Sequence, residues 1–108
     1  MVRIKICGIT NKRDALLAAE SGAHAVGFVF AASPRRIDPA AAREIVKILP
    51  PFISKVGVFV NEDSELVKEV ADLCGLDLLQ LHGDESPAYC SAFSQQVIKA
   101  IRVKDRSV

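Results

Sequence analysis

Short apolar segments alternate with amphipathic ones along the whole chain, and this alternation limits the fold more than any other feature of the sequence. Five segments have the composition of buried strands, at residues 2–7, 23–30, 55–60, 76–81 and 97–103. The four segments between them carry apolar residues at helical spacing. Strands that are separated by helices need right-handed crossovers, which produce a parallel sheet. The sequence therefore predicts an α/β protein built of parallel (β/α) units, with about five strands and four helices.

The ends of the expected helices carry suitable capping residues. Asn11 supplies a side-chain oxygen before the first helix, and Asp38 precedes Pro39 as an acidic N-cap before the second. Gly22 and Gly75 stand where left-handed C-caps are expected. The helical face that the first helix is expected to bury consists of Ala15, Leu16, Ala18 and Ala19.

Composition excludes several classes of protein. At 108 residues the chain is one domain, and its 14 basic and 13 acidic residues form no basic stripe for nucleic acid. No apolar run approaches the roughly 18 residues of a membrane span, and no signal peptide is present. The cysteines at positions 7, 74 and 90 are odd in number and form no CxxC pair, so neither a disulfide framework nor a zinc site is expected. These features favour a cytoplasmic protein.

Most of the polar residues with chemical potential follow the ends of the expected strands. In a parallel sheet these ends share one edge, which is where such proteins bind ligands. A site at the carboxyl face follows. Its candidate residues are Cys7, Thr10, Asn11, Ser33, Arg35, Arg36, Asn61, Gln80, His82, Asp84 and Arg102.

Cys7 occupies the junction between the first strand and the first helix. A lone cysteine in a strand is normally part of the core, and this is the expectation for Cys74 and Cys90. At a strand end, however, the thiolate of Cys7 is placed to accept a proton or attack carbon. The residues alone leave both interpretations of Cys7 open, a core cysteine and a reactive thiol.

Other charged residues also have two interpretations. Arg35 and Arg36 form either a solvated pair or a carboxylate-binding site with two parallel hydrogen bonds. His82 serves either a structural hydrogen bond or a contact with substrate, and the first is favoured. Asp84 and Glu85 precede a helix, so capping and the helix dipole account for them.

A small doubly wound binding module is an alternative with the same elements. A phosphoacceptor module of that kind needs acidic residues after the first strand and an aspartate after the third to hold magnesium. Here Gly8 follows Cys7, and Asn61 follows the third strand. The sequence therefore disfavours this alternative.

Four blocks of sequence at successive strand ends closely resemble phosphoribosylanthranilate isomerase. They are Lys5-Ile6-Cys7-Gly8-Ile9-Thr10, Gly27-Phe28-Val29-Phe30 with Ser33-Pro34-Arg35-Arg36, Gly57-Val58-Phe59-Val60-Asn61, and Gln80-Leu81-His82-Gly83-Asp84-Glu85. The resemblance implies a (β/α)8, or TIM, barrel of tryptophan biosynthesis. It also implies a cofactor-free Amadori rearrangement of N-(5-phosphoribosyl)anthranilate to 1-(2-carboxyphenylamino)-1-deoxyribulose 5-phosphate, with this small phosphorylated substrate as partner and no metal.

The resemblance also implies roles for individual residues. Cys7 is the general base, and Arg36 binds the anthranilate carboxylate, with Arg35 as the rival for that role. Gln80 and His82 line the pocket. The family's general acid, an aspartate on the sixth strand, and its phosphate site after strands seven and eight have no counterpart here, and Asp105 does not replace the acid.

A barrel of this kind takes at least about 200 residues, so residues 1–108 are expected to form the N-terminal part of one barrel domain. Such a fragment is expected to be inactive alone. Its edge strands and inward face would be open to water, which predicts self-association. The alternative function is a non-catalytic, self-associating α/β fragment.

Overall fold

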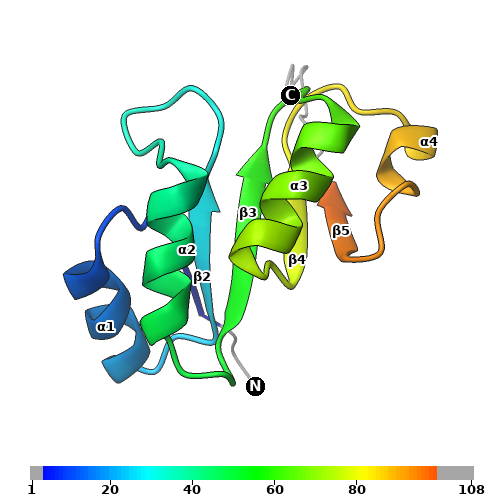
Figure 1. Cartoon of the computed structure of the whole chain (residues 1–108). Helices are drawn as coiled ribbons and strands as arrows, with labels where there is room; N and C mark the ends of the chain where they lie inside the picture. Colours follow the sequence, from blue (N-terminus) through cyan, green and yellow to red (C-terminus); the bar gives the residue numbers. More distant parts are fainter. Residues whose placement is uncertain (1–3, 100–108) are drawn as a thin grey trace, which may run out of the picture.

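The computed structural model describes residues 4–99 and confirms the alternation of strands and helices (Figure 1). The strands are β1 (Lys5–Cys7), β2 (Ala25–Val29), β3 (Ser54–Phe59), β4 (Leu78–Leu81) and β5 (Gln96–Lys99). The helices are α1 (Lys12–Glu20), α2 (Pro39–Ile48), α3 (Ser64–Cys74) and α4 (Pro87–Cys90). The expected last strand continued to residue 103, and residues 100–103, like Asp105 and Val2, lie outside the described residues.

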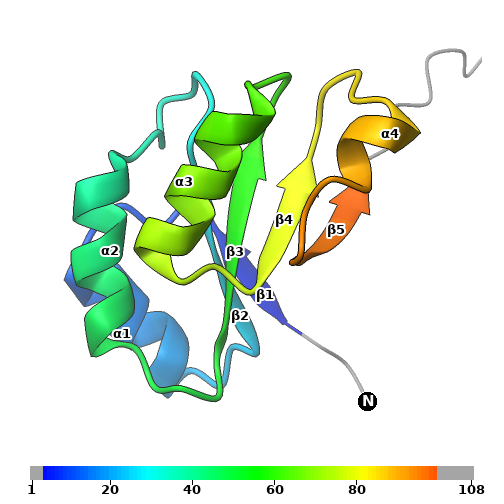
Figure 2. The same cartoon turned by 45° about the vertical axis from the view of Figure 1, so that its right-hand side comes forward.

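All neighbouring strands run parallel, in the order β1-β2-β3-β4-β5. Figures 1 and 2 show α1, α2 and α3 over the same face of this sheet, with α4 beside β5. No helix among residues 4–99 covers the opposite face, which we call the inner face. This arrangement follows from right-handed crossovers between sequential parallel strands.

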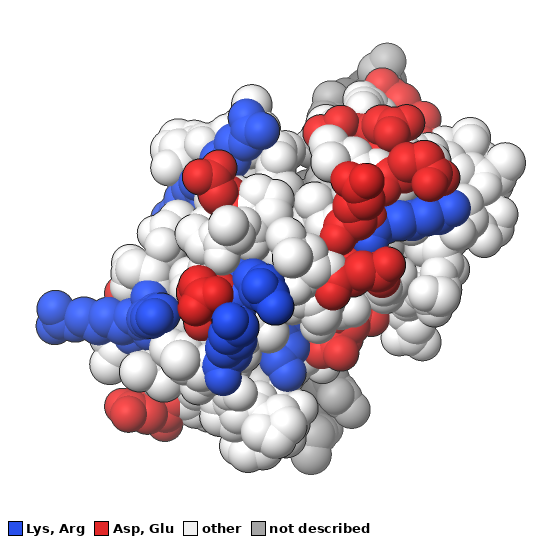
Figure 3. Space-filling view, viewed as in Figure 1, with Lys and Arg blue, Asp and Glu red and all other residues white. Residues whose placement is uncertain are grey.

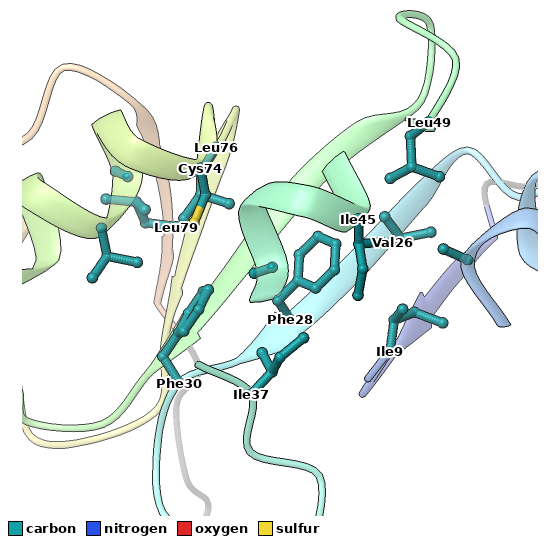
Figure 4. Close-up of a cluster of buried hydrophobic side chains, with 14 of the residues drawn as sticks. Ile9, Val26, Phe28, Phe30, Ile37, Ile45, Leu49, Cys74, Leu76 and Leu79 are labelled. Atoms are coloured by element: carbon teal, nitrogen blue, oxygen red, sulfur yellow. The ribbon is translucent and has the colours of Figure 1, made fainter. Parts of the chain in front are cut away.

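The main hydrophobic core lies between the sheet and its helices (Figure 4). Val26 and Phe28 of β2 are fully buried there, and the rings of Phe30 and Phe59 stack with centroids 5.2 Å apart. Side chains alternate between the two faces of a strand. Because these core residues point towards the helices, their neighbours in each strand point to the inner face.

One row of side chains on the inner face contains the predicted general base. In the register of the sheet, Cys7 pairs with Gly27, Gly27 with Val56, Val56 with Leu78, and Leu78 with Gln96. The thiol on β1 therefore shares a face with residues from every other strand of the sheet.

The helix ends agree with the sequence in most details. Asn11 Oδ1 accepts a hydrogen bond from the Asp14 amide at 2.8 Å, and Gly22 and Gly75 have φ angles of 89° and 67°. Asp38 stands at the N-cap of α2, but its side chain makes no capping hydrogen bond. Proline at the next position removes one amide that would need a cap.

The predicted buried face of α1 is wrong at Leu16, whose side chain is 42% exposed. Ala15 and Ala18 are the buried residues of this helix. They are three positions apart and therefore lie on one side of the helix, where their small size lets α1 approach the sheet closely.

Candidate active site

Cys7 is exposed at the carboxyl end of β1, on the inner face. Its Sγ lies 2.9 Å from the point that a β-carbon on Gly27 would occupy, so any larger residue at position 27 would displace the thiol. The amides of Gly8 and Ile9 both donate to the Gly27 carbonyl, at 3.0 and 3.1 Å. These bonds fix the turn that follows Cys7 and hold the thiol at the rim of the sheet.

The two adjacent arginines lie at the same rim but face different cavities. Arg35 packs over Gly8 and lines a cavity of about 450 Å³ together with Cys7. Arg36 forms an isolated parallel bridge with Val29 at the end of β2, and it lines a cavity of about 230 Å³ with an apolar floor that includes Phe30. The first cavity contains Arg35 and not Arg36, and it lies between β1 and α1, because Ile6 and Leu17 also line it.

Gln80 and His82 come together with Lys5 on the inner face. Lys5 Nζ donates to Gln80 Oε1, and Gln80 Nε2 is hydrogen-bonded to His82 Nε2. Lys5 lies two residues before Cys7 on the same side of β1. The structure thus connects the predicted pocket residues of β4 to the strand that carries the thiol.

The sequence-based explanation of Glu85 as a capping residue is wrong. Ser86 is the N-cap of α4, and its Oγ accepts from the Tyr89 amide at 3.1 Å. Glu85 instead points back into the fold with a side chain only 1% exposed, where it accepts from the Asn61 amide at 2.7 Å and pairs with Lys99 at 3.1 Å. This carboxylate links the ends of β3, β4 and β5.

Asn61 completes this rim clamp, which we define as Asn61, Glu85 and Lys99. Asn61 has a φ of 49°, a left-handed conformation that asparagine tolerates better than most residues, and its Oδ1 accepts from the Asp84 amide at 2.6 Å. Lys99 Nζ also donates to the Gly83 carbonyl. The clamp therefore holds the backbone directly after His82.

Electrostatics in the clamp favour the charged carboxylate. Burial opposes ionisation of Glu85, but hydrogen bonds from the amides of Asn61 and Glu85 itself, together with Lys99, outweigh it and lower the pKa of the carboxyl.

The two other cysteines lie away from the rim. Burial raises the pKa of the Cys74 thiol, whose Sγ donates to the Pro39 carbonyl at 3.3 Å. Cys74 is a core residue, as predicted, and Cys90 is half-buried against the core.

The helix-covered side of the molecule carries separated charges. In Figure 3, acidic side chains gather over α3 and the loop that leads to α4, whereas lysine and arginine side chains lie mainly over α1 and α2. No continuous basic surface spans this face. Between residues 4 and 99, none of the helices has both the length and the apolar character needed to cross a membrane.

Two contacts at the carboxyl rim had little or no signal in the sequence. The bond between Lys5 and Gln80 joins strands separated by β2 and β3, and the rim clamp depends on a side chain that turns back into the fold. The one available signal was the set of polar residues at strand ends, because residues at a shared rim are close in space.

Five sequential parallel strands, with a helix between each strand and the next, define the chain as successive units of a β/α barrel with its polar rim at the carboxyl ends. The family model "N-(5'phosphoribosyl)anthranilate (PRA) isomerase" matches residues 4–108. The chain belongs to this family of isomerases.

Named relatives give the same result. The chain is 54% identical over 108 residues to N-(5'-phosphoribosyl)anthranilate isomerase of Pelobacter propionicus, covering 99% of this chain and 52% of that protein. It is 57% identical over 105 residues to the Moorella thermoacetica isomerase, covering 97% and 47%. The chain therefore spans about half the length of the curated relatives it matches.

Solved structures agree with the fold. The phosphoribosyl anthranilate isomerase of Thermotoga maritima superimposes with a TM-score of 0.94 at 52% identity, covering 99% of this chain and 54% of that one. A second isomerase structure, with a TM-score of 0.94 at 51% identity over 99% of this chain and 57% of its own, holds reduced 1-(O-carboxyphenylamino)-1-deoxyribulose 5-phosphate. The five strands and their helices thus correspond to about half of that barrel.

Proposed function

We propose that these five strands and four helices belong to an enzyme that converts N-(5'-phosphoribosyl)anthranilate into 1-(2-carboxyphenylamino)-1-deoxyribulose 5-phosphate in tryptophan biosynthesis. The observation that carries the proposal is the exposed thiol of Cys7, held over Gly27 at the carboxyl rim of a chain in this family. The reaction belongs in the cytoplasm, where such thiols stay reduced.

In this mechanism Cys7 is the general base. Protonation of the ribose ring oxygen breaks the bond from that oxygen to C1 and leaves an open-chain iminium. The iminium acidifies the proton on C2, and the Cys7 thiolate removes it to give an enolamine. The enolamine then tautomerises to the ketone. No step in this sequence needs a cofactor, because every transfer is of a proton.

Arg36 is proposed to bind the anthranilate carboxylate through two parallel hydrogen bonds. Arg35 is the rival, and its packing over Gly8, the residue directly after Cys7, supports it. Gln80 and His82 complete the pocket on the side of β4. The general acid and the phosphate site are assigned to barrel strands after β5, so residues 1–108 act as the N-terminal part of one barrel domain and are inactive alone.

Calorimetry with anthranilate separates the two arginines. We expect Arg36→Ala to weaken binding to the 108-residue chain about 10-fold or more, because a charge-assisted pair contributes roughly 1.5–3 kcal/mol. Arg43→Ala, an exposed arginine on α2, is the control and should leave binding unchanged. A loss with Arg35→Ala alone transfers the role to Arg35, and equal binding by all variants contradicts a carboxylate site at this rim.

The uncovered inner face favours a second, non-catalytic property, which is self-association. Ile98 on this face is 46% exposed, and β1 and β5 are the edge strands of the described sheet. Open edges and exposed apolar residues promote pairing with further strands. Sedimentation of the chain is expected to show a mass that rises with concentration, and a monomer at every concentration would contradict this expectation.

A further inference from the structure

A line of three polar side chains crosses the inner face from β1 to β4. Lys5 Nζ donates to Gln80 Oε1, and the other end of the Gln80 amide meets His82 Nε2. In the sheet register, the residues beside Lys5 are Ala25 of β2 and then Ser54 of β3. Gln80 pairs with Val58 of β3 in the same register, so the long lysine reaches diagonally across the face to a strand that is not its neighbour.

The chemistry of these groups fixes which atom faces which. A lysine ammonium has donors and no acceptor, so the end of the Gln80 amide that faces Lys5 is its oxygen. The other end is then the NH₂ group, which can only donate. The His82 Nε2 that faces it must accept. A neutral imidazole with an accepting Nε2 carries its proton on Nδ1.

We propose that Lys5 and Gln80 are positioning residues that hold His82 as the neutral Nδ1–H tautomer. His82 then gives the pocket a hydrogen-bond donor and takes no part in proton transfer. Among residues 4–99 no hydrogen bond occupies the His82 Nδ1, which leaves that donor for an oxygen of the ligand. The ligand role rests on the isomerase function proposed above, whereas the tautomer does not.

The chain contains an internal reference for this proposal. It has two histidines, and the Nδ1 of the other, His24, accepts the Ile4 amide at 2.9 Å. His24 must therefore carry its proton on Nε2 when neutral. The two histidines of one molecule are expected to be opposite tautomers, which removes any dependence on an external standard.

Ring nitrogen shifts in a two-dimensional NMR spectrum of the ¹⁵N-labelled 108-residue chain test the assignment. At about pH 8, above the ordinary histidine range, His82 should be Nδ1–H and His24 Nε2–H, and His24→Gln assigns the signals. In Gln80→Glu the carboxylate accepts from both neighbours, so His82 should change to Nε2–H. One net hydrogen bond makes the favoured His82 tautomer about 5-fold more populated than the other. The favoured form is Nδ1–H in the parent chain and Nε2–H in Gln80→Glu.

Gln96→Glu is the matched control, since it adds the same charge on the inner face. Gln96 lies on β5, two residues before Ile98, which is the residue that pairs with Gln80. It should leave the His82 tautomer unchanged. Lys5→Met provides a second variant. Without the lysine the Gln80 side-chain amide can rotate, so the population of the Nδ1–H tautomer of His82 should decrease. An Nε2–H His82 in the parent chain overturns the proposal, as does an unchanged tautomer in both Gln80→Glu and Lys5→Met. Because no substrate is needed, this result is independent of anthranilate binding.

Discussion

Changing Cys7 to serine is expected to lower kcat/KM about 10²- to 10⁴-fold in a joined chain, because a serine hydroxyl cannot replace a thiolate as general base. The joined chain consists of residues 1–108 followed by the part of the Thermotoga maritima isomerase that this chain does not cover. The match of the two folds, with a TM-score of 0.94, makes the junction between the two parts feasible. The loss of substrate fluorescence measures turnover.

Cys90→Ser is the control for the loss of a thiol as such. Cys90 is the half-buried last residue of α4, which leads into β5 at the opposite edge of the sheet from β1, and its replacement should leave kcat/KM close to that of the parent. The 108-residue chain without the added part should show no turnover. Full activity of the Cys7→Ser joined chain would assign the base to another residue.

Changing Glu85 to glutamine is expected to lower the free energy of unfolding by about 1.5–3 kcal/mol at neutral pH, the range for hydrogen bonds to a charged group. Glutamine keeps an acceptor for the Asn61 amide but loses the charge beside Lys99. Since the carboxyl is 1% exposed, water does not replace these contacts. Urea denaturation of both proteins measures the difference.

The same comparison has a defined dependence on pH. The folded pKa of Glu85 lies below its ordinary value of 4.5, so its stabilising contribution is complete above that value and is lost as the pH falls through the folded pKa. The difference in free energy of unfolding between the parent and Glu85→Gln should therefore disappear at acid pH. Glu44→Gln is the control, because Glu44 pairs with Lys47 at 3.0 Å on the exposed surface of α2 and should matter little at any pH. If this difference in free energy of unfolding stays constant from neutral to acid pH, the result would contradict the role of the Glu85 charge.

The order of elements was predictable because hydrophobic periodicity and end signals agree. Gly75 is the left-handed C-cap of α3, as its position indicated, whereas Gly22 has a positive φ one residue after Ser21, the C-cap of α1. The prediction for Leu16 was wrong because a short helix lies against the sheet through its two alanines, and helical spacing alone does not show which apolar residues face the core.

The site was predictable to the level of the rim and no further. Parallel strands bring Cys7, Gln80 and His82 to one edge, and the polar residues after each strand indicated this. The direction of a side chain in a loop depends on contacts far along the chain, so neither the different cavities of Arg35 and Arg36 nor the inward turn of Glu85 could be derived from local sequence.

Cys7 and an arginine of the loop after β2 are proposed to act on one substrate at the inner rim. A crystal structure of the joined chain with reduced 1-(O-carboxyphenylamino)-1-deoxyribulose 5-phosphate, the ligand held by one of the solved relatives, tests it most directly. The predicted result has Arg36 or Arg35 paired with the ligand carboxylate and the Cys7 sulfur facing C2 of the sugar. A ligand bound with its C2 remote from Cys7, or with its carboxylate on neither arginine, would contradict it.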